Sequence, residues 1–229
     1  MEMLGTDSRL NGEAPSNKAT TNSTTPPQKL YEGKVVVLNG FPGAGKLTIL
    51  KRAKELLPTT HTRLLDNHLL IDPVSAVIPD RSKEHHELRR KVRAPIFEVI
   101  RKLALEGHVI LMMACLAEGN DTDAAFCQEH LDIVHGTDVP LFWFNAQCDQ
   151  DILEERVKSP ERCQGTKTKL TDVNVVRKLL RENRLIEPQR SVDEHLKLIV
   201  ETLDVSGELD DSVRHLMNLV CFMQSNDQI

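Results

Sequence analysis

The sequence contains few aromatic residues and no long apolar run. Aromatic residues make up 3% of the 229 positions, with a single tryptophan, Trp143. No apolar segment approaches the ~18 residues that a membrane-spanning helix needs. The N-terminus also lacks the apolar core of a signal peptide. We therefore expect a protein that does not associate with membranes.

The five cysteines follow neither a metal-binding nor a disulfide pattern. Their number is odd and no Cys-x-x-Cys spacing occurs, which is typical of reduced thiols in a cytosolic protein. We therefore expect a cytoplasmic location. Positive charge is not in excess either, since 29 Lys and Arg stand against 34 Asp and Glu, for a net charge of −5. Long nucleic acid and anionic membranes are thus not expected as partners.

A glycine-rich segment over residues 40–48 is the strongest motif in the chain. It reads Gly-Phe-Pro-Gly-Ala-Gly-Lys-Leu-Thr, which matches the phosphate-loop pattern Gly-x-x-x-x-Gly-Lys. An apolar, β-branched run over 34–39 precedes it, and apolar residues at helical spacing follow over 48–57. Glycine turns and the unpaired amides at a helix start form a site for phosphate. The predicted nucleotide-binding residues here are Gly40, Pro42, Gly43, Ala44, Gly45, Lys46, Leu47 and Thr48.

Two departures from this motif concern Mg²⁺. Leu47 stands where many phosphate loops carry Ser or Thr, and the hydroxyl comes one position later, at Thr48. A further strand, predicted to end at Cys115, lacks the terminal Asp that holds Mg²⁺ through water in many such proteins. The acids Asp121 and Asp123 come later and suit the cap of a helix over 124–135. Thr48 is therefore the one candidate metal ligand.

Candidate acceptor-binding residues follow a second predicted strand, Thr62–Leu65. In open α/β sheets, ligands bind beyond the carboxyl ends of the strands, which is where Asp66 and His68 come. A carboxylate there would orient or deprotonate a hydroxyl that attacks the γ-phosphate. The alternative for Asp66 is a helix cap or a turn, and a structural role is the alternative for His68.

A long helical pattern over 82–106 carries two further candidates, Arg89 and Arg93. Pro95 lies inside the pattern, so we expect a kink there or a second helix that starts after Ala94. The two arginines would reach an anionic substrate, or they belong to a solvated basic face of the helix.

Positive charge is concentrated over residues 156–190. This stretch holds ten Lys and Arg against four Asp and Glu, a local charge of +6, so the rest of the chain carries about −11. Such a segment in an acidic protein indicates an anionic ligand. We predict a lid over about 156–172 whose Arg156 and Arg162, with Arg181 beyond it, close over a triphosphate. The alternative is an exposed helix face and a loop.

The order of the elements predicts the fold. Residues 1–32 are rich in Ser, Thr, Asn and Pro and are expected to form a disordered tail. Residues 33–222 form the predicted domain, in which further strands over 140–146 and 198–205 bring the total to five. Alternation of strands and helices predicts a three-layer α/β/α fold with a five-stranded parallel sheet.

Residues 33–220 resemble the P-loop small-molecule and nucleoside-monophosphate kinases: adenylate kinase, shikimate and gluconate kinases and chloramphenicol phosphotransferase. The loop is similar to that of adenylate kinase, which also carries its Thr two positions after the Lys. Asp66 matches a substrate-contacting acid of shikimate kinase and chloramphenicol phosphotransferase. The stretch 156–169 matches the arginine-bearing lid, and Ser206-Gly207 matches the loop that lines the adenine pocket. The segments 64–73 and 169–172 also resemble P-loop kinase-like proteins of unassigned substrate.

The resemblance implies a kinase that uses ATP and Mg²⁺ to phosphorylate a small-molecule acceptor. Its implied catalytic residues are Lys46, Asp66, Arg156 and Arg162. Two alternatives stay open, a nucleotide or polynucleotide kinase and a nucleotide-binding switch with little catalysis. The chain has no guanine-reading Asn-Lys-x-Asp motif, which disfavours a GTPase. The sequence indicates neither the acceptor nor the oligomeric state.

Overall fold

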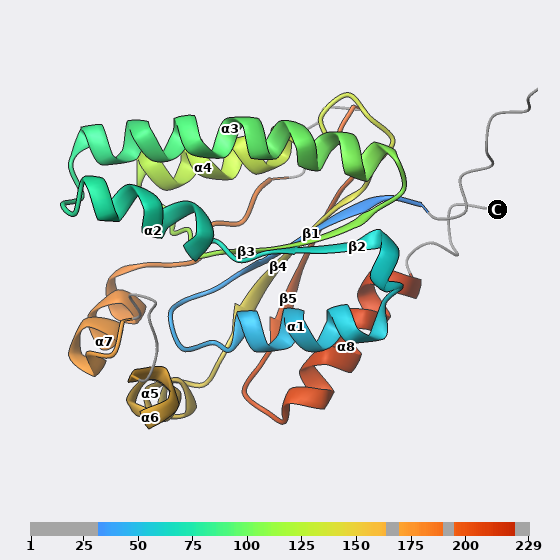
Figure 1. Ribbon diagram of the computed structural model, residues 1–229. Helices are drawn as coiled ribbons and strands as arrows, with labels where there is room; N and C mark the ends of the chain where they lie inside the picture. The colour runs from blue at the N-terminus through green and yellow to red at the C-terminus, as the bar shows by residue number, and fades with distance from the viewer. Residues whose placement is uncertain (1–31, 164–169, 190–194, 223–229) are drawn as a thin grey trace, which may run out of the picture.

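The computed structural model describes residues 32–163, 170–189 and 195–222, and its centre is a parallel sheet (Figure 1). Five strands lie in the order β2-β3-β1-β4-β5. They are β1 (Lys34–Asn39), β2 (Thr62–Leu65), β3 (Val109–Ala114), β4 (Leu141–Gln147) and β5 (Leu198–Asp204). The predicted five-stranded parallel sheet is confirmed. The predicted tail falls outside the described residues apart from Glu32, and residues 164–169 of the predicted lid also lie outside them.

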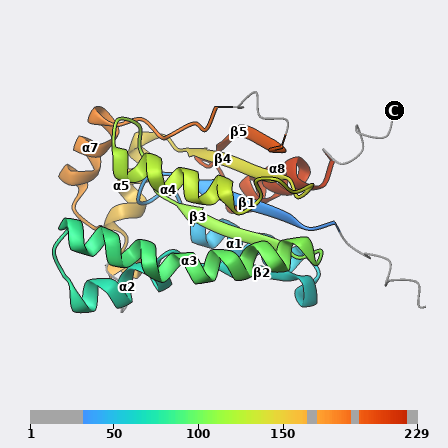
Figure 2. The same ribbon diagram turned by 90° about the horizontal axis from the view of Figure 1, so that it is seen from above.

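Helices cover both faces of the sheet, which confirms the three-layer fold (Figures 1 and 2). One face carries α1 (Lys46–Leu56) and α8 (Leu209–Phe222), and the other carries α2 (His68–Val77), α3 (Lys83–Leu105) and α4 (Asp121–Asp132). Side chains of β1 alternate between the two cores. Val35 and Val37 pack in the core that includes Phe97 of α3, while Val36 and Leu38 pack in the other. Burial on both sides explains why the strand is continuously apolar.

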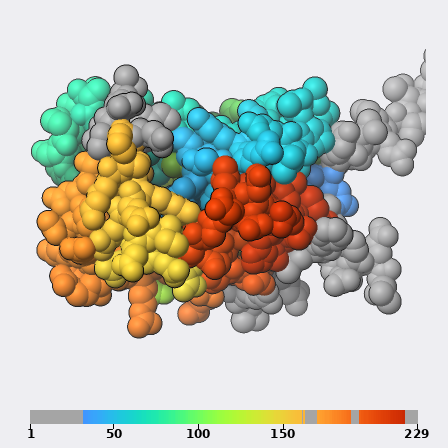
Figure 3. Space-filling view, turned by 90° about the horizontal axis from the view of Figure 1, so that it is seen from below, coloured from blue at the N-terminus to red at the C-terminus, as the bar shows by residue number. Residues whose placement is uncertain are grey.

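Three shorter helices lie beyond the carboxyl ends of the strands. They are α5 (Gln150–Lys158), α6 (Pro160–Cys163) and α7 (Val173–Glu182). Leu153, Val157 and Val176 give them a small apolar core of their own. Viewed from below, α8 lies beside α1, and the segment of α5 and α7 adjoins one end of that pair (Figure 3). A 3₁₀ turn, η1 (Thr59–His61), links α1 to β2. Within the described residues, no helix combines the length and the apolar character needed to cross a membrane.

Helix α2 was not predicted from the sequence. Pro73 lies inside it and removes one backbone hydrogen bond. Its first turn is nevertheless held by the backbone of Asp66, whose carbonyl accepts from the N–H of Leu69 at 2.9 Å. Leu70 and Val74 are buried, and Leu70 packs in the core that includes residues of β1 and β3. Tertiary packing of these two side chains therefore offsets the loss at Pro73.

Two predicted helix details differ from the structure. The helix over 82–106 does not break at Pro95: α3 is a single helix from Lys83 to Leu105. The N-cap of α4 is Asn120, whose Oδ1 accepts from two amides of the first turn, so neither Asp121 nor Asp123 is the cap. Helix α7 ends at Glu182. It ends there because residues 184–186 pair with the backbone of 116–118 instead.

Candidate active site

The phosphate loop between β1 and α1 depends on glycine at its tightest points. Gly43 and Gly45 have φ angles of +97° and +75°, which residues with a side chain rarely adopt. A Cβ atom on Gly43 would lie 2.7 Å from Cγ2 of Val157, and one on Gly40 would lie 3.0 Å from Cβ of Ala146. The loop is thus packed tightly between α5 and the end of β4. Side chains at these glycines would displace the backbone that faces a phosphate.

Lys46 is buried under this loop. Its Nζ atom donates to the carbonyl oxygens of Gly40 at 2.6 Å and Phe41 at 3.0 Å, and burial lowers the pKa of its ammonium group. No carboxylate in the described part of the chain forms an ion pair with Lys46. A buried ammonium held only by carbonyl oxygens gains strongly from an anion. The geometry therefore fits a phosphate group.

Two asparagines that the sequence analysis did not single out hold the strand ends together. Asn39, at the end of β1, accepts from the N–H of Leu116 at 2.8 Å and donates to the carbonyl of Leu116 at 3.2 Å. It also donates to Oδ1 of Asn145 on β4 at 3.0 Å, and Asn145 donates to the carbonyl of Ile186 at 3.2 Å. These bonds fix the chain beyond β3 beside the phosphate loop. The sequence feature that could have identified these asparagines is a polar residue at the end of an apolar strand.

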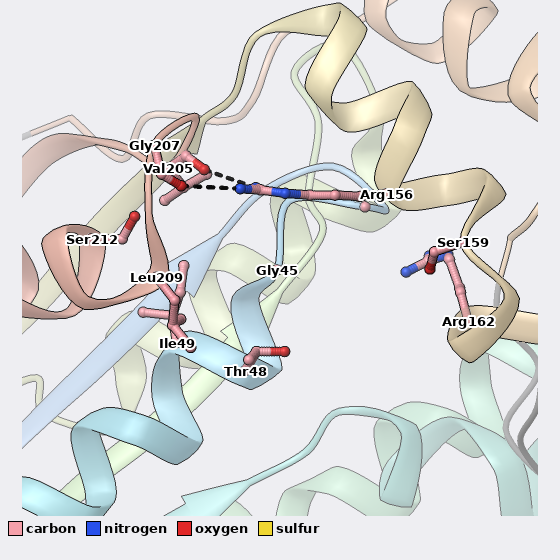
Figure 4. Close-up of a pocket in the computed structure, with 11 residues that line it drawn as sticks. Gly45, Thr48, Ile49, Arg156, Ser159, Arg162, Val205, Gly207, Leu209 and Ser212 are labelled. Atoms are coloured by element: carbon pink, nitrogen blue, oxygen red, sulfur yellow. Dashed lines mark hydrogen bonds between the residues drawn. The ribbon is translucent and has the colours of Figure 1, made fainter.

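The smaller of two cavities at the phosphate loop has a volume of about 340 Å³ (Figure 4). The loop and α1 contribute Gly43, Gly45, Thr48 and Ile49, and the opposite wall comes from the start of α8 and the segment before it. Arg156 of α5 extends across to that segment, where it donates to the carbonyls of Val205 at 2.7 Å and Gly207 at 3.2 Å. Its guanidinium therefore ties α5 to the wall of the cavity.

The other residues predicted around this cavity have separate positions. Arg162 lines it and donates from Nε to the carbonyl of Leu170 at 2.8 Å. Gly207 also lines it, whereas Ser206 does not and instead accepts from the N–H of Asp149 at 2.9 Å. Arg181 lines neither cavity.

The larger cavity, of about 700 Å³, lies on the other side of the phosphate loop. Its walls come from the phosphate loop, including Lys46, from the starts of α2 and α4, from α3 and from the end of β3. It contains three of the four predicted substrate residues, His68, Arg89 and Arg93. The two cavities share four lining residues, Gly43, Gly45, Thr48 and Arg162. Thr48 and Arg162 therefore face the junction between them.

Asp66, the fourth predicted substrate residue, does not line either cavity. It is 6% exposed, and its Oδ1 accepts from the N–H of His68 at 3.0 Å. The same oxygen lies 3.0 Å from Nδ1 of His68. A carboxylate only accepts hydrogen bonds, so this contact places the proton on Nδ1 and leaves the lone pair of Nε2 available. Asp66 thus orients the imidazole that lines the larger cavity.

The two arginines of α3 differ in their partners. Arg93 donates from Nε and Nη2 to both carboxylate oxygens of Glu129 on α4, at 2.8 and 2.9 Å. Its guanidinium carbon also lies 3.7 Å from the ring centroid of Phe126. Arg89, one turn earlier, is 8% exposed, and its Nε is buried without a hydrogen-bond partner. Burial, with the charges of Arg93 and Arg81, lowers the pKa of Arg89 to about 10.

Several solved structures share the arrangement of strands and helices seen in this protein. No protein-family model and no curated protein matches the sequence. Thymidylate kinase from Candida albicans matches the structure with a TM-score of 0.53 at 14% identity, over 84% of this chain and 93% of that one. A sugar kinase from Janibacter sp. matches with a TM-score of 0.51 at 12% identity, over 82% and 94%. The tunicamycin resistance protein of Deinococcus radiodurans gives 0.50 at 14%, over 82% and 96%. The chain has the P-loop kinase fold.

Within this P-loop kinase fold, one lining residue was not predicted as part of the site. Asp123 of α4 is the single acidic residue among those described that line the two cavities. Its Oδ2 accepts from the N–H of Ala117 at 3.0 Å, and burial raises the pKa of its carboxyl group. From the sequence Asp123 is expected to cap a helix, because only the fold brings α4 to the cavity that the phosphate loop also lines. No group of three or more potential metal ligands among His, Cys, Asp and Glu occurs in the described residues.

Proposed function

We propose that this protein is a kinase that transfers the γ-phosphate of ATP to a hydroxyl or phosphate group of a small metabolite. The observation that carries the proposal is the pair of cavities that meet at the phosphate loop, with Thr48 and Arg162 common to both. Phosphoryl transfer needs a donor site and an acceptor site that meet at the transferred group. A nucleotide-binding switch requires the donor site alone.

The smaller cavity is the proposed ATP site. The loop amides hold the phosphates, and Lys46 approaches them from the larger cavity, which it lines. Ile49, Val205 and Leu209 offer apolar surface to the nucleoside. Mg²⁺ fits beside Thr48, whose exposed hydroxyl lines both cavities. Because Mg²⁺ keeps several waters and binds phosphate oxygens, one protein ligand is consistent with its use. When bound, the ion supplies charge neutralisation on the transferred group.

The larger cavity is the proposed acceptor site, and its size is in the range of small-molecule sites. The acceptor oxygen attacks the γ-phosphorus, the bond to the oxygen bridging the β- and γ-phosphates breaks, and ADP leaves. His68 takes the proton of an acceptor hydroxyl, with Asp66 orienting the ring and stabilising the imidazolium. Arg162 stabilises negative charge on the phosphoryl group between the cavities. Arg156 contributes by holding the cavity wall.

The test is ADP release from ATP and Mg²⁺ across metabolite alcohols, nucleosides, nucleotides and aminoglycosides. An acceptor should stimulate turnover by the wild type and by Lys51→Ala, a control at an exposed lysine of α1. It should not stimulate Lys46→Ala, which lacks the buried ammonium. Tight ATP binding with no stimulation across the whole panel would contradict the kinase and favour a switch.

A further inference from the structure

We infer that the acceptor of this kinase carries a phosphate or carboxylate group in addition to the atom that is phosphorylated, and that Arg89 binds that group. The inference rests on the proposed function, because it takes the larger cavity as the acceptor site. It narrows the acceptor to anionic metabolites, such as sugar phosphates, sugar acids or nucleoside monophosphates. Neutral alcohols and cationic aminoglycosides are excluded.

Arg89 is a buried cation without a compensating anion. It is 8% exposed and lines the larger cavity, and its Nε has no hydrogen-bond partner. Within the described residues, none of its nitrogens forms an ion pair or a hydrogen bond. Its one recorded contact of this kind is with the ring of Phe126, 5.8 Å from the guanidinium carbon. Cation–π contact at this distance compensates only part of the lost hydration.

No nearby carboxylate in the described parts of the chain forms an ion pair with Arg89. Both oxygens of Glu129 accept from Arg93, and no ion pair joins Glu129 to Arg89. Asp123 directs one oxygen to the N–H of Ala117 and likewise forms no ion pair with Arg89. Two further arginines that line the cavity, Arg81 and Arg93, lower the pKa of Arg89 through their positive charge. Asp123 and Glu129 offset only part of these effects, so the cavity keeps positive charge that an anionic ligand would neutralise.

The contrast with Arg93 separates a structural arginine from a ligand-binding one. Arg93 has the bidentate carboxylate partner that a buried guanidinium ordinarily has. Arg89 has the same burial and no such partner, although methionine or leucine would pack there without a desolvation penalty. A planar guanidinium in a cavity binds phosphate and carboxylate through two parallel hydrogen bonds. The geometry of Arg89 therefore suits the anionic end of the acceptor.

Stability measurements distinguish the two roles. Removal of an uncompensated buried charge relieves a desolvation cost, so Arg89→Met should melt at the wild-type temperature or above it. Arg93→Met leaves the carboxylate of Glu129 without its partner and should melt at a lower temperature. A fall in the melting temperature of Arg89→Met comparable to that of Arg93→Met would overturn the inference, because it would show a structural role for Arg89.

Kinetics provide the main test, with each anionic compound paired with its uncharged counterpart. The pairs are a sugar phosphate and its sugar, a sugar acid and its methyl ester, and a nucleoside monophosphate and its nucleoside. We expect stimulation by the anionic member of a pair. Arg89→Met should raise the KM for that acceptor about 100-fold, with the KM for ATP unchanged. Arg90→Met, at the exposed neighbouring arginine, is the matched control and should resemble the wild type. Comparison of the phosphate and carboxylate pairs identifies which anion is bound.

A binding measurement tests the same site without turnover. Inorganic phosphate is titrated into protein whose ATP site is filled with a non-hydrolysable ATP analogue, so that phosphate does not enter the loop. It should raise the melting temperature of the wild type and of Arg90→Met, and not that of Arg89→Met. Equal effects on all three proteins would overturn the inference, as would preference for the neutral member of a pair. Failure of the analogue to bind would instead contradict the proposed function.

Discussion

The buried imidazole of His130 predicts how the stability of the protein depends on pH. His130 lies in α4, is 1% exposed and has its ring among those of Phe97, Phe126 and Trp143. Its Nδ1 lies 2.8 Å from the carbonyl of Phe126 and donates to it. Burial lowers the pKa of His130 from 6.5 to about 4. The folded protein therefore holds this imidazole neutral where the unfolded chain already binds a proton.

The shifted pKa of His130 sets the direction and the size of the change in stability with pH. The unfolded state gains a proton near pH 6.5 and the folded state only near pH 4, so stability is fully present above about pH 6.5 and falls as the pH drops toward 4. The difference of 2.5 between the two pKa values corresponds to about 3 kcal/mol at about 1.4 kcal/mol per unit. This value is the full contribution of His130 alone. Carboxylates titrate over part of the same pH range, so a variant that lacks His130 is needed to isolate it.

Urea unfolding followed by the fluorescence of Trp143 measures this effect at about pH 7.5 and about pH 4.5. His130→Phe keeps a ring in the core and removes the titration. It should lose about 2 to 3 kcal/mol less than the wild type between the two conditions. His215→Gln, at an exposed histidine of α8, is the control and should follow the wild type. The same loss of stability in His130→Phe and in the wild type would refute the reasoning.

Three further predictions concern the site and its supports. Gly43→Ala should weaken ATP binding at least about 10-fold in a binding titration, because a Cβ at φ +97° presses against α5; unchanged affinity would contradict the packing argument. Arg177→Met should lower the melting temperature at neutral pH, because Arg177 holds the pKa of Glu154 at about 2. That stabilisation is present above about pH 4.5 and is lost toward pH 2, so a difference between the two proteins that persisted at pH 2 would count against it. Asp66→Asn should leave the ATP affinity unchanged and lower kcat at least about 10-fold with a stimulating acceptor; a normal kcat would remove Asp66 and its partner imidazole from the mechanism.

The fold was predictable because its signals are local. Each strand is an apolar run bounded by turn residues, and the segment 40–48 identifies the connection between the first strand and the first helix. Helix boundaries were less accessible where tertiary contacts override local preference. Pro73 and Pro95 both lie inside helices, since buried side chains on either side of each proline hold the helix in place. The tendency of proline to interrupt a helix can be recognised in the local sequence. The tertiary packing that outweighs this tendency cannot.

The sequence predicted candidate residues for the site, but not the contacts that these residues make in the structure. Asp66 was predicted to contact the acceptor, and in the structure it orients His68, which lines the cavity. Arg156 was predicted to neutralise phosphoryl charge, and its guanidinium is occupied by carbonyls of the cavity wall. Asp123 was assigned to a cap, which Asn120 provides. Each of these roles depends on a contact between side chains and backbone groups that only the folded structure reveals.

Charge pairing, rather than charge density, is the basis on which we propose Arg89 as the anion-binding group. The basic stretch 156–190 indicated an anionic ligand in the sequence, yet Arg177 within it is paired with Glu154. Arg89 belongs to a helix of mixed charge and differs from Arg93 only because Glu129 meets the later residue. Glu129 is 36 residues from Arg93 in the chain and reaches it because α4 packs beside α3. A carboxylate placed one turn away on α4 would neutralise Arg89 and leave Arg93 uncompensated, with the same composition and the same local charge. In the acceptor site that we propose, recognition of an anion would thus depend on the contact between two helices.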